Sequence, residues 1–320
     1  MSRAFVTGIG GQDGSYLAER LLADGVEVHA LTLETDPPPD LPGVTLHPGD
    51  LTRVEEVRAL LLELAPDEVY NLAAISSVAL AWERPDLTAR VNGLAAVGLL
   101  ESALEVQDKT GRRVSVVQAS SAEIFGEPAT SPQDESTPLR PVNPYGAAKA
   151  YAHLMVGVYR RRDLHATSLV LYNHESPRRP PQFVSRKITS TVAAIAQGRA
   201  DVLTLGNLDV RRDWGWAPDY VDAMVRAARA DDADDFVVAT GVGHTVREFV
   251  GAAFARVGID DWPHLVTVDP AFVRPVDPTD LTGDASRARE RLGWAPTVAF
   301  DEIVGRMVDA DLDPPSGGGR

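Results

Sequence analysis

The stretch TGIGGQDGSYLAE, residues 7–19, decides the fold of this chain. It follows the apolar run SRAFVTG (2–8), which we predict to be a strand, and leads into SYLAERLLADG (15–25), whose apolar spacing predicts a helix. Three of its glycines, Gly8, Gly11 and Gly14, have the spacing G-x-x-G-x-x-G. Glycines between a strand and a helix let a pyrophosphate approach the backbone at the helix N-terminus. The stretch therefore predicts a dinucleotide-binding fold.

Apolar strand patterns and helical patterns alternate through the first half of the chain. Further strands are expected at 26–31, 68–74, 113–121 and 166–172, and further helices at 54–64, 86–107 and 145–162. Near-continuous apolar strands that alternate with helices are typical of a parallel sheet covered on both faces. We therefore predict an α/β fold of Rossmann type, with a doubly wound parallel sheet.

The alternation stops after residue 172, where prolines crowd 177–181 and the later elements are expected to be shorter. We interpret this part as a smaller, mixed α/β substrate-binding lobe, with DFVVATG (235–241) returning to the main sheet. The predicted units are a dinucleotide-binding domain at 1–172 with 208–242, a substrate lobe at 173–207 with 243–312, and a disordered tail at 313–320.

Composition excludes several classes of function. The 320 residues carry a formal net charge of −15, so a nucleic-acid partner is not expected. The chain has no cysteine, which excludes disulfides, thiolate zinc sites and cysteine nucleophiles, and no metal site is expected. No apolar run approaches the ~18 residues of a membrane span. The first residues lack the pattern of a signal peptide, so the expected location is the cytoplasm.

The segment NPYGAAKAY (143–151) contains Tyr145 and Lys149, four residues apart. Residues at this spacing share one face of a helix. A nearby ammonium stabilises a phenolate, so we expect a lowered pKa for Tyr145 and a base that works near neutral pH. With the glycine motif, this pair resembles the Tyr-x-x-x-Lys motif of short-chain dehydrogenases, and the resemblance implies their chemistry.

Two further polar residues, Ser121 and Glu123, stand in QASSAEIFG (118–126), where a predicted strand ends. Ligands bind at this edge of such sheets. Ser121 can hydrogen-bond a sugar hydroxyl. Glu123 can remove a proton from a carbon next to a ketone. A dehydratase requires such a base, whereas a simple dehydrogenase or 4-epimerase does not.

The loop YNHESPRRP (172–180) places Arg178 beside Arg179 in an acidic chain. Adjacent guanidinium groups repel each other unless an anion or water screens them. A diphosphate is one such anion, since arginine binds phosphate with paired donors. The alternative is that Arg178, Arg179, Arg211 and Arg212 only pair with surface acids.

Together these motifs resemble the GDP-mannose 4,6-dehydratases of the extended short-chain dehydrogenase superfamily, from about residue 3 to 311. The most specific segments are NHESPRR and LGNLDVRRDWG (205–215). The resemblance implies that Tyr145 takes the proton from the sugar O4 while hydride passes from C4 to the oxidised cofactor. Glu123 then removes the C5 proton, water leaves from C6, and hydride returns to C6. The product is a 4-keto-6-deoxy sugar, and the cofactor stays bound and is recycled.

The resemblance also implies the contacts of individual residues. Catalytic roles fall to Ser121, Glu123, Tyr145 and Lys149. Cofactor contacts fall to Gly8, Gly11, Gln12, Asp13, Gly14, Thr32, Asp50, Leu51, Leu72, Ala73, Ala74, Ser76, Tyr145, Lys149, His174 and Arg179. Contacts to the GDP sugar fall to Ser77, Asn173, Lys187, Arg212 and Arg274. The lobe would then bind a sugar nucleotide.

The chain departs from the family pattern at two places. Leu33 and Glu34 stand where the family has an arginine pair that holds the 2′-phosphate of NADP, in a loop that is also shorter here. We therefore expect NAD(P) as cofactor, with NAD favoured over NADP. Ile75, Ser77 and Leu87 replace a family Gln, His and Tyr, so the substrate or outcome could differ.

Several alternatives remain open from sequence: a 4-epimerase, a dehydratase with another nucleotide sugar or product, or an inactive dinucleotide-binding protein. The superfamily resemblance implies a homodimer built from helices 86–107 and 145–162. Ala147, Ala148, Ala150 and Ala152 are expected to allow close approach between the helices. A tetramer is not expected to be obligatory, because the loop that helps to join dimers is shortened.

Overall fold

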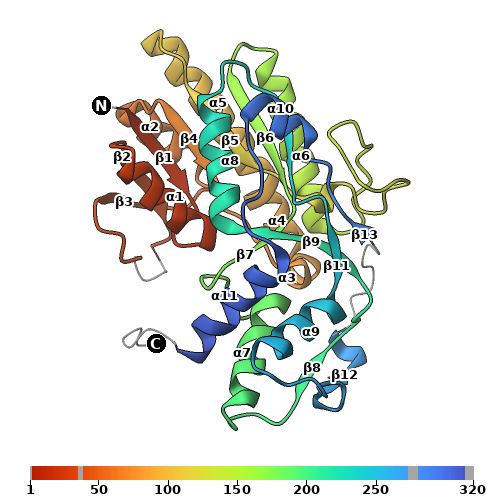
Figure 1. Ribbon diagram of the computed structural model, residues 1–320. Coiled ribbons are helices and arrows are strands. Elements are labelled where there is room, and N and C mark those ends of the chain that lie inside the picture. Colours follow the sequence, from red (N-terminus) through yellow and green to blue (C-terminus); the bar gives the residue numbers. More distant parts are fainter. Residues whose placement is uncertain (1, 35–38, 273–279, 314–320) are drawn as a thin grey trace.

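The computed structural model describes residues 2–34, 39–272 and 280–313. Its largest element is a seven-stranded sheet in the order β10-β6-β5-β4-β1-β2-β3 (Figure 1). All neighbouring strands run parallel. The strands are β1 (Arg3–Thr7), β2 (Glu27–Thr32), β3 (Val44–Pro48), β4 (Glu68–Asn71), β5 (Ser115–Ala119), β6 (His165–Leu171) and β10 (Asp235–Val238). The predicted Rossmann-type fold is confirmed, including the return of β10, whereas β3 was not predicted.

Helices cover both faces of this sheet. One face carries α1 (Gln12–Ala23) and α8 (Ala217–Arg229), and the other carries α2 (Val54–Leu64), α5 (Ala95–Thr110) and α6 (Pro144–Arg160). Ala4 and Val6 of β1 face the first core, and Phe5 faces the second. This alternation follows from the two-residue period of a strand. The order of strands reverses between β1 and β4, so their carboxyl ends open the crevice where such folds bind ligands.

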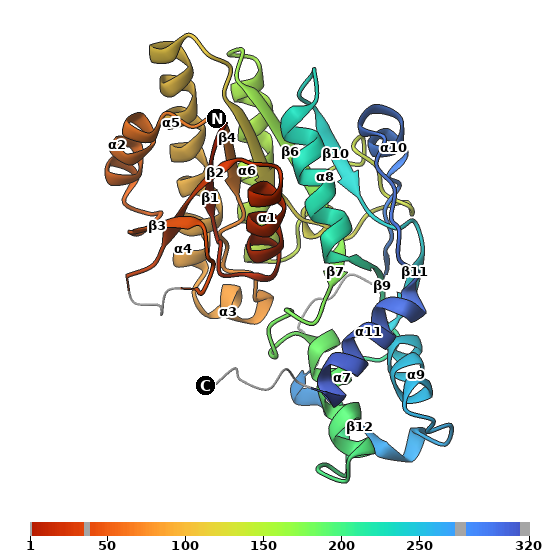
Figure 2. The same ribbon diagram turned by 60° about the vertical axis from the view of Figure 1, so that its left-hand side comes forward.

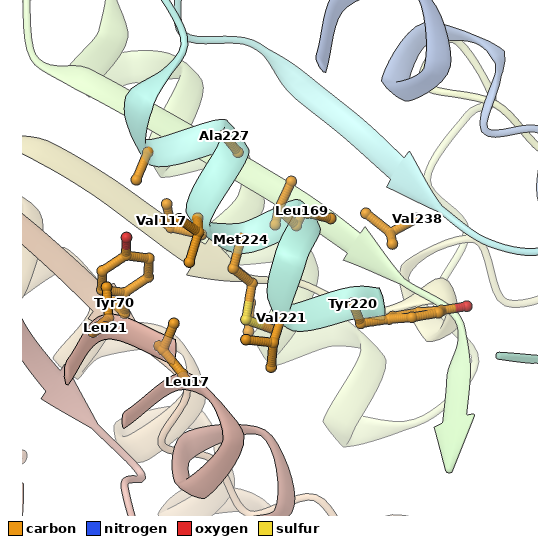
Figure 3. Close-up of a cluster of buried hydrophobic side chains, with 14 of the residues drawn as sticks. Leu17, Leu21, Tyr70, Val117, Leu169, Tyr220, Val221, Met224, Ala227 and Val238 are labelled. Carbon is orange, nitrogen blue, oxygen red and sulfur yellow. The ribbon is translucent and has the colours of Figure 1, made fainter. Parts of the chain in front are cut away.

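The core on the α1 side also draws in a late part of the chain. Figure 3 shows Val221 and Met224 of α8 between Leu17 of α1 and the side chains of the sheet. Trp294, which follows α10 (Ser286–Leu292), joins this core and donates its indole N–H to the backbone oxygen of Asp219 at 2.7 Å. The segment around α10 therefore packs with the main sheet, as both ribbon views show (Figures 1 and 2).

The second region has its own hydrophobic core and lies below the main sheet in both views (Figure 2). Its helices are α7 (Val184–Ala196), α9 (Val246–Arg256) and α11 (Phe300–Leu312). Its strands are β7 (Asn173–Glu175), β8 (Leu203–Leu205), β9 (Arg211–Trp216), β11 (Gly243–Thr245), β12 (Val266–Val268) and β13 (Asp280–Leu281). Strand β9 is central, with β7, β11 and β13 paired to it, while β12 pairs with β8.

The expectation of shorter late elements is wrong for α7 and α11, which each have 13 residues, whereas α1 has 12. The prolines of 177–181 lie in a loop before α7 and interrupt no helix. The division into two units stays a prediction. Residues 314–320 of the predicted disordered tail lie outside the described residues.

The predicted helix at 86–107 is confirmed as one continuous helical stretch that contains a π-helical segment. It consists of α4 (Pro85–Thr88), the π-helical segment (Ala89–Leu94) and α5. Asn92 in the π segment is buried, and its amide accepts from Ile75 N at 2.8 Å and donates to Ile75 O at 3.0 Å. This side chain ties the helix to the loop after β4. Short helical elements complete the fold at α3 (Val78–Glu83) and at the 3₁₀ turns Ala122–Ile124, Pro263–Leu265 and Pro270–Phe272.

Candidate active site

The glycine-rich turn joins β1 to α1, and each of the three glycines of its motif has a separate physical role. Gly8 has φ +75°, and a Cβ there would lie 2.7 Å from the backbone N of Ala73. A Cβ at Gly14 would lie 2.6 Å from the Cα of Ile9, so α1 packs directly on the turn. Gly11 caps α1 with no side-chain hydrogen bond, and a Cβ there would meet only the backbone O of Gly8, at 3.3 Å. The free N–H groups at this helix end fit a diphosphate.

Helix α1 begins at Gln12, three residues before the predicted start. The first turn is polar, so the apolar spacing could not reveal it. Its side chains bind the segment 174–176: Gln12 Nε2 donates to His174 O at 3.0 Å, and Ser176 Oγ donates to Gln12 Oε1 at 2.8 Å. Residues expected to contact the cofactor therefore also join the two regions of the chain.

His174 is buried with partners at both ring nitrogens. Nδ1 donates to the backbone O of Tyr172 at 2.7 Å, and Nε2 lies 2.9 Å from Asp13 Oδ2. Burial lowers the pKa of His174, but the charge and hydrogen bond of Asp13 outweigh it, so the net pKa is raised. Burial raises the pKa of Asp13, but the charges of His174 and Arg179 and its hydrogen bonds leave it lowered. The arrangement favours an imidazolium–carboxylate pair.

A line of buried polar side chains crosses the carboxyl ends of β1, β4 and β5. Thr7 Oγ1 donates to Asn71 Oδ1 at 2.6 Å, and Asn71 Nδ2 donates to Gln118 Oε1 at 2.7 Å. Gln118 Nε2 and Lys149 Nζ both donate to the backbone O of Ala119, at 2.9 and 2.8 Å. The line holds Lys149 in place. This line of hydrogen bonds was not predicted from the sequence. It could have been suspected, because each of the three apolar strands has a polar residue near its carboxyl end.

Tyr145 lies in the first turn of α6, one turn before Lys149. The Lys149 nitrogen is 5.9 Å from the centre of the tyrosine ring. Burial raises the pKa of Tyr145 to about 12, against the opposing effect of its hydrogen bond with Ser121. The predicted lowering of this pKa is therefore wrong for the chain alone, because burial disfavours the phenolate more than nearby groups stabilise it. Burial lowers the pKa of Lys149 to about 8.

Glu123 lies in the 3₁₀ turn after β5, beside Tyr145, and its charge also raises the pKa of that phenol. Its backbone N–H donates to Ser121 Oγ at 3.2 Å. Its carboxylate accepts from Asn143 Nδ2 at 2.8 Å. Asn143, whose side chain also caps α6, was not among the predicted site residues. The structure thus brings all four predicted catalytic residues to one end of α6.

The comparisons with known proteins identify the family. The family model for GDP-mannose 4,6 dehydratase matches residues 5–307. The chain belongs to the GDP-mannose 4,6-dehydratase family. GDP-mannose 4,6 dehydratase 1 of Arabidopsis thaliana is 44% identical over 97% of this chain and 90% of its own length. The human GDP-mannose 4,6 dehydratase is 40% identical over 97% and 91%. These findings confirm the resemblance inferred from the motifs.

Among solved structures, the UDP-glucose 4-epimerase of Thermus thermophilus, in complex with NAD, matches with a TM-score of 0.85. It is 30% identical and covers 98% of this chain and 99% of its own. The dTDP-glucose 4,6-dehydratase of Bacillus anthracis, at 20% identity and a TM-score of 0.81, shares the fold. This chain thus has the fold of these two sugar-nucleotide enzymes.

In this family member the adjacent arginines have different partners. Arg178 stacks on Tyr16 of α1, with its guanidinium 3.9 Å from the ring centre, and pairs with Glu19 at 2.6 Å. Arg179 Nε lies 3.3 Å from the buried Glu175, and its guanidinium is 3.9 Å from the centre of the Phe183 ring. The charge of Arg179 also acts on Tyr145. Arg178 is thus paired with a surface acid, whereas Arg179 lies near the reacting groups.

The residues expected to hold the GDP sugar lie mainly in the second region. Asn173 is in β7 opposite Trp214, and Lys187 of α7 lies 3.8 Å from the centre of the Phe272 ring. Arg212 of β9 is buried and donates to the backbone O of Arg211 at 2.7 Å. The Ser77 hydroxyl accepts from Leu80 N at 3.2 Å and caps α3. Arg274 lies outside the described residues.

The remaining predicted cofactor residues line the carboxyl ends of β2, β3 and β4. Thr32 ends β2, Asp50 and Leu51 follow β3, and Leu72, Ala73, Ala74 and Ser76 follow β4. Hydrogen bonds from the backbone and side chain of Thr52 lower the pKa of Asp50, and the charges of Arg53 and Arg90 add to this. Neither arginine was among the predicted cofactor residues. Each pairs with an acid of its own, Glu56 at 3.5 Å and Asp86 at 2.9 Å.

Within the described residues, no helix is long and apolar enough to cross a membrane. Nor does this part of the chain bring together three or more His, Asp or Glu side chains that could hold a metal ion.

Proposed function

We propose that this chain is a hydro-lyase that converts GDP-mannose into GDP-4-keto-6-deoxymannose with a tightly bound, recycled nicotinamide cofactor. The observation that carries the proposal is the placement of Glu123 beside Tyr145 and Ser121 at the start of α6. A 4-epimerase needs the tyrosine but has no use for a second base. The names of the relatives, GDP-mannose 4,6-dehydratases of plants and humans, support the same substrate.

The proposed roles follow from the positions of the side chains. Tyr145 accepts the proton of the sugar O4 hydroxyl, which Ser121 orients through its hydrogen bond to the phenol. Lys149, fixed on Ala119 O, supplies a positive charge close to the tyrosine ring. A nicotinamide cofactor, held by the glycine-rich turn and Lys149, would supply the acceptor for the C4 hydride and the donor of that hydride to C6. Glu123 takes the proton from C5, which the C4 ketone has acidified, and returns it to the C6 hydroxyl as that group leaves as water. The proton that Tyr145 took from O4 balances the protonation of C5, which completes the conversion.

The test is to incubate the purified protein with GDP-mannose and measure the mass of the product. Loss of one water supports the proposal, whereas an unchanged mass with an inverted C4 identifies an epimerase. Glu123→Gln is the informative variant, because the amide keeps the shape and removes the base. We expect it to reduce the cofactor on addition of substrate and to release no dehydrated product.

We propose that Lys187 and Arg212, with Arg274, bind the GDP portion. Charge-assisted hydrogen bonds to phosphate are strong, so Arg212→Ala should weaken GDP binding by ~1.5–3 kcal/mol. Calorimetry with GDP, UDP and dTDP tests the nucleotide preference. Equal affinity for all three would count against this assignment.

We propose that the cofactor is NAD rather than NADP. Leu33 is half-exposed and Glu34 is exposed directly after β2. The arginines whose charges act on Asp50, Arg53 and Arg90, are paired with acids. The 2′-phosphate of NADP, bound after β2, would be repelled by the Glu34 carboxylate. Among the groups described around Asp50, no unpaired cation would offset this repulsion.

We also propose a homodimer that forms through α6 and the π-helical segment. Tyr151, Leu154 and Val158 of α6 and Leu94 of the π segment are exposed apolar residues. Those of α6 follow the spacing of one helix face. Of the four alanines expected in this contact only Ala147 is exposed. Ala148, Ala150 and Ala152 are buried within the chain, so that part of the prediction is wrong. The cytoplasmic location stays a prediction.

A further inference from the structure

Asn143 precedes α6 and is only 5% exposed. Its Oδ1 accepts the backbone N–H of Gly146 at 2.8 Å, which caps the helix, and its Nδ2 donates to Glu123 Oε2 at 2.8 Å. The orientation of this amide is fixed by its partners, since a backbone N–H can only donate and a carboxylate can only accept. One buried side chain therefore sets both the start of α6 and the position of the carboxylate.

The backbone of the first turn of α6 also contacts the turn that carries Glu123. A Cβ at Gly146 would overlap with the backbone carbonyl of Glu123. The first turn of α6 thus packs directly on the 3₁₀ turn that carries Glu123. Tyr145 lies in that helical turn, between the cap residue and Gly146. A shift of the cap would therefore change the spacing between the carboxylate and the phenol.

The carboxylate itself depends on this contact. Glu123 is partly exposed, and its carboxylate has one described side-chain donor, the Asn143 amide. A glutamate on a short turn has three rotatable side-chain bonds, and a single charge-assisted hydrogen bond selects the conformer that faces the phenol. Positioning of this kind has large effects on rate, since a misplacement of about 1 Å can cost ~10²-fold.

We propose that Asn143 is a positioning residue for the dehydration step. It aims the Glu123 carboxylate at the carbon next to the reacting hydroxyl, in register with Tyr145. The proposal rests on the proposed dehydratase function. It assigns the oxidation at C4 to Tyr145 and Ser121 without Asn143, so the two half-reactions should respond differently to its loss.

The test compares Asn143→Ser and Asn143→Asp with the wild type. Serine and aspartate both accept from the helix N–H as good N-caps, so α6 should form in each variant. Serine is too short to reach Glu123 while capping, and aspartate replaces the donor with a like charge. In single-turnover experiments with GDP-mannose, we expect cofactor reduction to stay within a few-fold of wild type. Release of dehydrated product should fall by ~10²-fold. Exchange of the C5 hydrogen with deuterated solvent should slow in parallel.

The matched control is Thr245→Ala, which removes the capping box of α9 far from Glu123 along the chain. It should lower thermal stability, as loss of a cap does, and leave the ratio of dehydration to oxidation unchanged. If both Asn143 variants slow the two half-reactions equally, or leave dehydration unchanged, Asn143 is only a helix cap and the proposal is overturned. Failure of the wild type to release water from GDP-mannose would instead overturn the proposed function, and this proposal with it.

Discussion

His174 Nε2 lies 2.9 Å from Asp13 Oδ2, and this pair joins the first turn of α1 to strand β7, 161 residues later in the chain. The His174 ring also stacks on Tyr220 at 4.4 Å between ring centres. The contact connects the glycine-rich turn to the strand that begins the second region. Its energy depends on pH because both partners titrate.

The pair should stabilise the protein in a defined pH window. The raised pKa of His174 contributes stability that is fully present below its usual 6.5 and is lost as pH rises through the folded value. The lowered pKa of Asp13 contributes stability present above its usual 3.8 and lost as pH falls through the folded value. Removing one partner of a buried pair costs ~3–5 kcal/mol. His174→Gln should therefore destabilise the protein most between pH 3.8 and 6.5, where both partners are charged, and less at alkaline pH.

Chemical denaturation of the wild type and His174→Gln at several pH values measures this difference. The control is His264→Gln, because His264 is largely exposed and lies outside the contact between α1 and β7. A difference in unfolding free energy that does not change with pH would show that the pair is not ionised.

Tyr145→Phe should reduce turnover by ~10²–10⁴-fold with substrate affinity nearly unchanged, because the phenol transfers a proton and makes little ground-state contact. The pKa of about 12 leaves the phenol mainly protonated at neutral pH. The rate of C4 oxidation in the wild type should therefore rise as pH increases. Single-turnover reduction of the cofactor measures both effects, and near wild-type activity in the variant would refute the role.

Replacement of Leu33 and Glu34 with arginine should shift cofactor preference toward NADP. A unit charge ~4 Å from another contributes ~4 kcal/mol at an effective dielectric of 20, so removal of Glu34 and addition of two cations should dominate. In the wild type we expect NAD to bind at least ~10-fold more tightly, or ~1.4 kcal/mol. Identification of the dinucleotide released on denaturation, followed by titration of both cofactors, tests this. Bound NADP would show that its phosphate is held by other groups, with Arg53 and Arg90 the first to examine.

Leu154→Glu should convert the proposed dimer into monomers. Leu154 is 58% exposed at the centre of the apolar face of α6, and a buried, unpaired charge there would oppose association. Val268→Glu is the control, since Val268 is 57% exposed in β12 of the second region. Light scattering at micromolar concentration reports the assembly. A wild-type monomer would contradict the proposed interface.

Gly14→Ala should disrupt the turn between β1 and α1. The new methyl group would lie 2.6 Å from the Cα of Ile9, so the backbone must move. Gly157→Ala in α6 meets nothing within 4 Å and should stabilise the helix by ~0.5–1 kcal/mol. Thermal unfolding and dinucleotide titration of both variants separate a packing defect at Gly14 from the general effect of adding a methyl group.

The sequence by itself determined the elements whose causes are local. The spacing of Gly8, Gly11 and Gly14 predicted the turn, because each glycine answers a constraint of the nearby backbone. The i, i+4 spacing of Tyr145 and Lys149 predicted their common face for the same reason. Helix α2 was predicted with its observed bounds, since its apolar period has no interruption. Local spacing did not reveal the first turn of α1, which is polar, or the π-helical segment at Ala89–Leu94, where Asn92 hydrogen-bonds to Ile75 in the loop after β4.

Only the tertiary structure decided which distant side chains meet. Asn143 and Glu123, Asp13 and His174, and the line from Thr7 to Gln118 lie on segments that the order of strands brings together. Hydrogen bonds act over about 3 Å, so they depend on the packing of the whole sheet. The direction of the Tyr145 pKa shift was missed for the same reason: burial is a property of everything packed around the phenol, and the spacing to Lys149 does not contain it.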